Sequence, residues 1–188
     1  MKYIQLIYTA AVVFLIVSIS SAWAAEFRAD MLEEKAGKRT QKSKLYVKDA
    51  QYRMTMEEDE LKLYLIVDEG SGTTTVLSPE HKEYRQVENN FFHSMSGNPV
   101  QSFYYHAEKY DRRELERETF KGYDCTKVLV QAGERKLYTA WISEELGFPL
   151  KILFHLGDGM SMELDNIKQG PVDPSVFTVP EGYTFREQ

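Results

Sequence analysis

The chain has 188 residues, with 29 acidic and 23 basic side chains and a formal net charge of −6. This excess of acid argues against a nucleic-acid-binding protein, because phosphate backbones are recognised by basic surfaces. Beyond the N-terminal region no stretch approaches the roughly 20 apolar residues that a membrane-spanning helix needs. The length suits one domain with its own hydrophobic core.

The N-terminus has the pattern of an export signal. Lys2 precedes an apolar run from Ile4 to Ile19, and Ala22-Trp23-Ala24 has the small-x-small ending of a cleavage site. We therefore expect residues 1–24 to be a signal peptide, cleaved after Ala24, and residues 25–188 to form a single exported domain. An uncleaved N-terminal anchor is the alternative.

Most of the exported chain alternates apolar and polar residues with a period of two, the pattern of β-strands. The runs are residues 27–32, 45–48, 52–57, 61–67, 126–130, 137–142, 150–156 and 160–164. Turn residues separate them, and Gly157-Asp158-Gly159 is typical of a hairpin. Strands at this spacing, without intervening helices, predict an antiparallel sheet of about ten strands.

The alternation stops between Glu88 and Arg113, where one helix is predicted. Asn98 can cap it and Pro99 suits its first position. One helical face then carries Val100, Phe103, Tyr104 and Ala107.

A large sheet with one apolar face must bury that face on another element. The segment from Phe91 to Tyr110 has the apolar residues to do so, including Phe91 and Phe92 before the helix. We therefore expect a mainly β (α+β) fold: a curved antiparallel half-barrel sheet with this segment as a short helical lid in its concavity.

Short motifs run in order through the exported chain. They are Phe27-Arg28-Ala29-Asp30, Leu45-Tyr46-Val47-Lys48, Tyr52-Arg53-Met54, Ile66-Val67-Asp68, Ser78-Pro79-Glu80 and the ending from Val172 to Tyr183. Together they are similar to the LolA/LolB/RseB-like superfamily of periplasmic half-barrel proteins. Through Gly122-Tyr123-Asp124-Cys125-Thr126-Lys127, Trp141-Ile142-Ser143 and Pro149-Leu150-Lys151, the chain more closely resembles an uncharacterised exported, lipoprotein-sorting-like family within it.

The resemblance implies a half-barrel in the periplasm of a Gram-negative bacterium. The best-understood members of the superfamily carry the acyl chains of lipoproteins, and a related member senses envelope stress. The carriers tend to have an arginine right after the strand that matches Leu45–Lys48, where this chain has Asp49.

No catalytic or metal-binding motif stands out, so we expect no enzyme activity, no cofactor and no metal. The sequence lacks a Gly-x-Ser-x-Gly elbow and a glycine-rich phosphate loop, and its four histidines lack the spacing of metal ligands. The single cysteine, Cys125, is expected to be either a small buried side chain or an exposed thiol. Asp111–Glu118, with its alternating acids and bases, is expected to be a soluble face or a helix tail.

Aromatic residues make up 13% of the chain, and with methionines they fill irregular apolar space and adapt to varied guests. An ordinary hydrophobic core explains the same residues. The predicted ligand-binding residues, in the pocket and its lid, are Phe91, Phe92, Val100, Phe103, Tyr104, Leu63, Leu65, Trp141 and Phe154.

The leading hypothesis is a non-catalytic periplasmic carrier of an acyl chain, a lipoprotein or a similar apolar ligand, which meets the membrane only peripherally. A protein-interaction or stress-sensing module of the envelope is the alternative, with edge strands or an acidic convex face meeting a partner. An enzyme using the same pocket is a third hypothesis.

Overall fold

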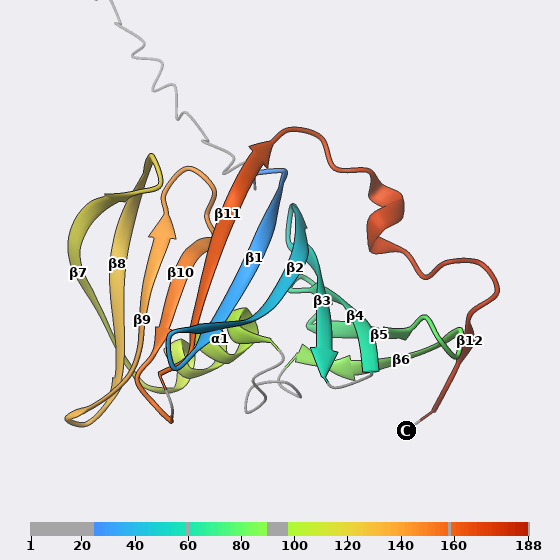
Figure 1. Ribbon diagram of the computed structural model, residues 1–188, viewed down its shortest axis with the longest axis horizontal. Coiled ribbons are helices and arrows are strands. Elements are labelled where there is room, and N and C mark those ends of the chain that lie inside the picture. Colours follow the sequence, from blue (N-terminus) through green and yellow to red (C-terminus); the bar gives the residue numbers. More distant parts are fainter. Residues whose placement is uncertain (1–24, 59–60, 90–97, 158, 188) are drawn as a thin grey trace, which may run out of the picture.

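The computed structural model describes residues 25–58, 61–89, 98–157 and 159–187. These residues form one sheet of twelve strands and one α-helix, α1, at Pro99–Lys109 (Figure 1). The strands are β1 (Phe27–Lys35), β2 (Lys38–Lys48), β3 (Gln51–Glu58), β4 (Leu61–Asp68), β5 (Thr73–Ser78), β6 (Glu83–Glu88), β7 (Asp111–Phe120), β8 (Tyr123–Ala132), β9 (Arg135–Ser143), β10 (Pro149–Phe154), β11 (Ser161–Gln169) and β12 (Thr184–Phe185). A short 3₁₀ helix, η2, spans Pro174–Phe177.

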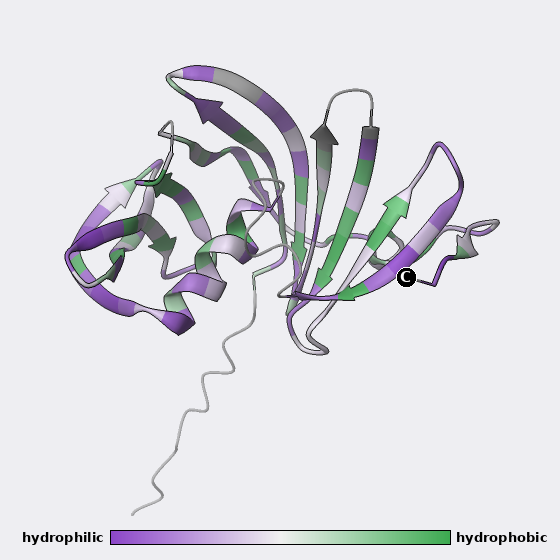
Figure 2. Cartoon of the chain, turned by 90° about the horizontal axis from the view of Figure 1, so that it is seen from below, coloured by the Kyte–Doolittle hydropathy of each residue, from purple (hydrophilic) through white to green (hydrophobic). Residues whose placement is uncertain are grey.

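Strand β1 lies in the middle of the sheet, between β2 and β11. On one side of β1, antiparallel hairpins lead through β2 to β6. The chain then forms α1 and continues into β7 at the opposite end of the sheet, and β8 to β11 lead back from β7 to β1. The short β12 pairs in parallel with β6. Figure 2 shows α1 on the concave side of the arched sheet.

The predicted fold class is confirmed, because the sheet is open, curved and antiparallel apart from β12, with a helix in its concavity. Each predicted run overlaps one strand. The predicted helix cap is also confirmed: the Asn98 side chain accepts a hydrogen bond from the Gln101 backbone N–H at 3.1 Å, and Pro99 begins the helix. The first part of the predicted lid, with Phe91 and Phe92, lies outside the described residues.

Of the two expectations for Asp111–Glu118, the soluble face is confirmed and the helix tail was wrong, because this exposed segment belongs to strand β7. β7 lies at the end of the sheet and pairs with β8 alone. Its side chains from Asp111 to Thr119 are all exposed, so the strand has no buried face. Its sequence therefore lacks the apolar residue at every second position by which a half-buried strand is recognised.

The core lies between the concave face of the sheet and α1. Fully buried side chains from the strands include Phe27, Met31, Leu45, Met54, Leu65, Leu150, Ile152, Met162 and Leu164. From α1, Val100 and Phe103 join the same cluster. A half-barrel cannot close this face on itself, so the helix supplies the cover. Cys125 is buried in this core, which decides between its two expected roles.

Candidate functional site: the concave face and its mouth

The structure brings together several of the predicted pocket residues. Val100 and Phe103 are buried against the concave face, which also contains the buried Leu65 and the half-buried Leu63. Phe154 packs edge-on against the Tyr138 ring, with 5.0 Å between ring centroids. These residues line one continuous apolar cluster beneath α1.

Trp141 lies on the other face of β9. Tyr138 points toward α1, and residues three apart in a strand point to opposite faces. The Trp141 ring centroid is 5.0 Å from Lys127 Nζ and 5.4 Å from Lys151 Nζ, and its indole N–H donates to Glu118. Trp141 is therefore buried, as expected, but under a charged cover on the convex side rather than beneath α1.

A cleft opens beside the second half of α1, where the β2–β3 and β4–β5 turns face the helix. It consists of two adjoining hollows of about 530 Å³ and 230 Å³ that share Glu69, Tyr104 and Glu108. The larger is also lined by Ser71, Gly72, Thr73, Glu88, Asn89, Gln101 and Tyr105, and the smaller by Val47, Asp49, Ala50, Gln51, Tyr52, Gly147 and Phe148. We call the two hollows together the mouth cleft.

The smaller hollow has an aromatic floor that continues into the core. The Phe148 ring packs edge-on against Tyr52 at 5.8 Å and against Phe27 at 5.7 Å, between centroids. The half-buried Tyr104 separates the cleft from Phe103, whose ring centroid lies 5.3 Å away. Burial, with a smaller contribution from the charge of Glu69, raises the pKa of Tyr104 to about 12, so its hydroxyl stays protonated at neutral pH.

The rim of the mouth cleft is acidic. Glu69 and Glu108 border both hollows, Asp49 borders the smaller and Glu88 the larger. Partial burial raises the pKa of Glu69, a hydrogen bond from Asn89 opposes this, and the charge of Glu108 adds to it. The rim therefore repels an anionic head group and accepts a neutral or cationic one.

A chain of hydrogen bonds fixes the start of α1 to the sheet. Asn98 Nδ2 donates to Tyr52 Oη at 3.2 Å and to Gln101 Oε1 at 3.1 Å. Gln101 Nε2 donates to Thr74 Oγ1 at 3.0 Å, and Thr74 Oγ1 donates to Asn89 Oδ1 at 2.8 Å. Sequence reasoning missed this chain; polar Gln101 beside the apolar face of the helix was its one signal.

A second set of contacts fastens α1 to β9. Tyr138 Oη lies 3.0 Å from Ser102 Oγ and 3.1 Å from His106 Nδ1, and the same His106 nitrogen lies 2.6 Å from the Ser102 carbonyl oxygen. None of the three side chains lines the mouth cleft. These contacts join the middle of α1 to β9 and hold the helix against the sheet.

Two further features were sought in the described part of the chain. It contains no grouping of three or more His, Cys, Asp or Glu side chains that could hold a metal ion. None of its helices combines the length and the apolar composition that crossing a bilayer requires.

An open antiparallel sheet curved around one helix defines a half-barrel fold. The chain belongs to the family described as a domain of unknown function, DUF4412, whose match covers residues 29–147. No curated protein matches the chain.

Two solved structures, PNGF-II and a protein from Thermus thermophilus, share the fold at low sequence identity. PNGF-II is 12% identical with a TM-score of 0.59, and the match covers 88% of this chain and 32% of PNGF-II, so this chain spans about a third of that protein. An uncharacterised conserved protein from Thermus thermophilus is 8% identical with a TM-score of 0.58, over 89% of this chain and 93% of its own. MucB of Pseudomonas aeruginosa, in complex with MucA, is 16% identical with a TM-score of 0.47, over 82% and 56%.

Proposed function

We propose that this protein is a non-catalytic binding protein of the periplasm that carries an acyl chain or a similar apolar group, and that residues 1–24 direct its export. The observation that carries the proposal is the mouth cleft, whose floor at Tyr52 and Phe148 continues into the aromatic core. Its two hollows together fall within the roughly 300–1,000 Å³ that small-ligand sites occupy.

Tyr104 controls how far a guest reaches. The first half of α1 is buried and tied to the sheet through Asn98, whereas Glu108 and Lys109 in its last turn are exposed. An apolar chain that enters the smaller hollow meets Tyr104 before Phe103. A ligand can move the Tyr104 side chain only if it binds the open arrangement more tightly than the closed one. The free-energy cost of opening must therefore be small.

The acidic rim narrows the class of ligand. Because Glu69 and Glu108 border both hollows, a free fatty acid would bring its carboxylate close to like charges. A neutral ester or amide of the same chain avoids this repulsion. We therefore assign the site to neutral acylated molecules, among them the acylated end of a lipoprotein.

Competition for a fluorescent apolar probe tests the proposal. At pH 8 a monoacylglycerol should displace the probe at lower concentration than the fatty acid of equal chain length. Tyr104→Ala should increase probe binding, and Tyr123→Ala is the matched control because Tyr123 is also half-buried against the core but lies outside the cleft. If neither the wild-type protein nor Tyr104→Ala binds the probe, the concavity is plain core and the carrier function is wrong.

The rim has its own test. The double substitution Glu69→Gln and Glu108→Gln should improve fatty-acid binding and leave monoacylglycerol binding unchanged. Glu134→Gln, on the exposed β8–β9 turn, removes one carboxylate elsewhere and should change neither. Equal improvement in both proteins would mean that overall charge, not the rim, sets the preference.

An envelope protein-interaction module remains the second candidate, and edge strand β7 favours it. One side of β7 pairs with β8, and no other described strand pairs with the second side. An extended peptide could add to such an edge. Lipid extraction and mass spectrometry of protein purified from the periplasm separate the two candidates: bound acylated lipid supports the carrier, and a stoichiometric envelope protein without lipid supports the module.

A further inference from the structure

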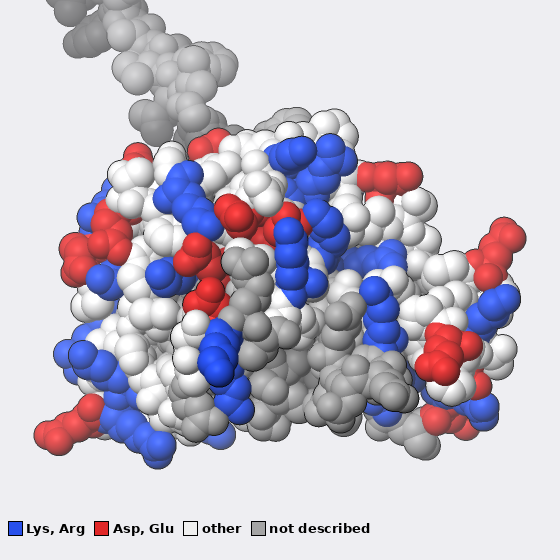
Figure 3. Space-filling model, viewed as in Figure 1, with Lys and Arg blue, Asp and Glu red and all other residues white. Residues whose placement is uncertain are grey.

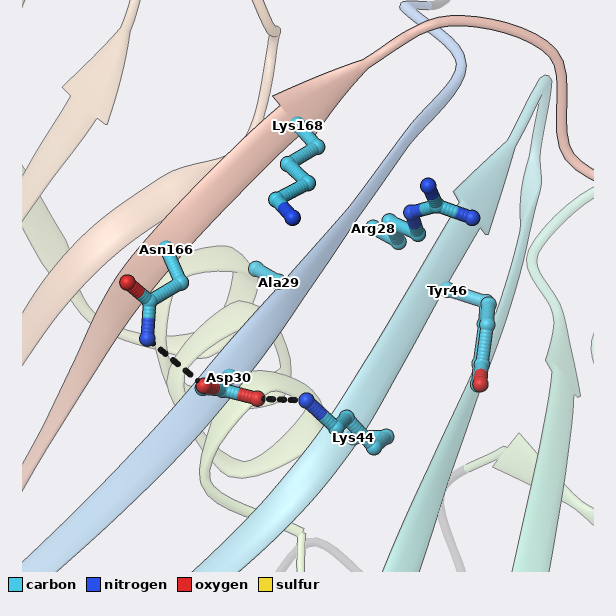
Figure 4. A pocket seen from close by; sticks show the side chains of 7 residues that line it. All are labelled: Arg28, Ala29, Asp30, Lys44, Tyr46, Asn166 and Lys168. Carbon is cyan, nitrogen blue, oxygen red and sulfur yellow. Dashed lines mark hydrogen bonds and ion pairs between the residues drawn. The ribbon is translucent and has the colours of Figure 1, made fainter.

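A hollow of about 250 Å³ lies on the convex face, across β11, β1 and β2 and on the opposite side of the sheet from α1 (Figure 4). Its lining residues are Arg28, Ala29, Asp30, Lys44, Tyr46, Asn166 and Lys168. Figure 3 shows Lys and Arg side chains gathered over this part of the molecule. The concentration of cations is notable in a chain whose net charge is −6.

Two of these cations face each other across neighbouring strands. Arg28 of β1 and Lys168 of β11 are register partners, and the next partner of Arg28, on β2, is Tyr46. Both cationic side chains are exposed, and within the described residues neither forms an ion pair or a side-chain hydrogen bond. Like charges directly opposite in a sheet destabilise it. A bound anion would turn this repulsion into attraction.

The floor of the hollow is rigidly built. Asp30 is only 4% exposed; it accepts hydrogen bonds from Lys44 and, at 2.8 Å, from Asn166 Nδ2, and Lys42 Nζ lies 3.3 Å away. Hydrogen bonding from Lys44 and then from Asn166 lowers the pKa of Asp30 to about 2. The negative charge of Asp30 is therefore balanced by Lys42 and Lys44. It does not compensate the positive charges of Arg28 and Lys168.

A β-bulge directs Asn166 into this arrangement. The register between β1 and β11 shifts between Arg28 and Asp30, and Asn166 has a φ of 50°, in the left-handed region. Bulges re-aim a side chain that a regular strand would point elsewhere, and they are enriched at functional sites. Here the bulge lets Asn166 reach the Asp30 carboxylate while Lys168 keeps its place opposite Arg28.

We propose that this hollow binds a phosphate group, held between the Arg28 guanidinium and the Lys168 ammonium. Two uncompensated cations match the charge of about −1.5 to −2 that a phosphate monoester has at pH 7 better than they match a singly charged carboxylate. The planar fork of arginine binds phosphate oxygens in pairs. The site is independent of the mouth cleft, which lies on the opposite face of the sheet.

Titration of the exported protein with inorganic phosphate, followed by backbone amide NMR at constant ionic strength, tests the site. Saturable shifts at residues 28, 46 and 168 are expected, with acetate binding more weakly. Arg28→Gln and Lys168→Gln should each weaken phosphate binding by about tenfold, the effect of losing one charge-assisted hydrogen bond. Arg135→Gln, at an exposed arginine that begins β9, should leave binding unchanged. Shifts that do not saturate, or an equal loss in Arg135→Gln, would overturn the proposal.

Sedimentation with vesicles identifies the source of the phosphate. Vesicles of phosphatidylcholine with phosphatidic acid present a phosphate monoester on a surface, and pure phosphatidylcholine vesicles do not. Binding to the first kind alone, lost in Arg28→Gln and kept in Arg135→Gln, supports a lipid head group. Binding of free phosphate without vesicle binding supports a soluble phosphate compound. Binding of neither contradicts the site.

Discussion

The two faces of this sheet have opposite chemistry, although they are built from the same strands. On β1, Phe27 and Met31 are buried beneath α1, whereas Arg28 and Asp30 between them line the convex hollow. On the concave face the Asn98 hydrogen-bond chain joins buried polar side chains, while the convex face leaves like charges opposed. A curved sheet with a period of two therefore has one apolar and one charged face, and our two proposals assign a different ligand to each.

The largest expected effect on stability comes from shortening Phe103, through which α1 covers the concave face. Phe103 is 1% exposed, and Phe103→Ala leaves a cavity beneath α1, so unfolding free energy should fall by about 3–5 kcal/mol. Lys109→Ala, on the exposed end of the same helix, should change it by less than about 0.5 kcal/mol. Denaturant unfolding measures both. A loss below about 1 kcal/mol in Phe103→Ala would show that α1 is not part of the core.

Glu33 tests the difference between the two faces of the sheet, because it is a buried acidic residue on the apolar face. It follows Met31 by two residues on β1, so both side chains point to the same face. Burial raises the pKa of Glu33 to about 7. The folded state therefore keeps this proton at a higher pH than the unfolded state, so stability falls as pH rises from about 4.5 to about 7.

Glu33→Gln should remove this part of the pH dependence and stabilise the protein at pH 8, by an amount on the order of 3 kcal/mol. Near pH 4 the two proteins should be almost equally stable. Urea unfolding at both pH values measures the difference, with Glu134→Gln on an exposed turn as the control. A constant difference at the two pH values would rule out the raised pKa as its cause.

Asn98→Ala tests whether the polar chain holds the helix. The substitution removes the helix cap and leaves Tyr52 and Gln101 without a shared partner, so a loss of about 1–3 kcal/mol is expected. Asp173 caps the exposed η2 in a similar way, and Asp173→Ala should have a smaller effect. Amide hydrogen exchange should show faster opening of α1 in Asn98→Ala alone.

The smallest effect is expected on the convex face. Without bound anion, Arg28→Gln removes repulsion from Lys168, so the protein should be as stable as the wild type or more stable by up to about 0.5 kcal/mol at low salt. Thermal unfolding with and without phosphate provides the measurement, and phosphate should stabilise the wild type only. A clear destabilisation in the absence of anion would show that Arg28 has a structural role instead.

Period-two alternation predicted eight of the strands, because it records one buried face directly, but it did not predict β5, β6 or β12. It failed for β7, where both faces meet water and only charges alternate. It also could not place Trp141, because β9 is buried at every position from Leu137 to Trp141 and the pattern does not say which face meets the helix.

The sites were harder to predict than the fold, because their residues are far apart in the sequence and come together only when the strands pair. Tyr104 was among the predicted residues, but the acids of the cleft come from separate elements: Asp49 and Glu69 from turns, Glu88 from β6 and Glu108 from α1. Arg28 and Lys168 become neighbours only through the β1–β11 register. A bulge at Asn166 sets that register locally, and no residue pattern in the sequence marked it.

The central place of β1 has a consequence for how the chain folds. Synthesis begins at the N-terminus, so β1 is made first, yet one of its two neighbours, β11, follows only when nearly the whole sheet has been made. Pairings this distant in sequence close slowly, and an unpaired strand edge invites association with other chains. Until β11 arrives, β1 exposes an open edge in the middle of the future sheet, so nascent chains of this protein should depend on chaperones that shield it.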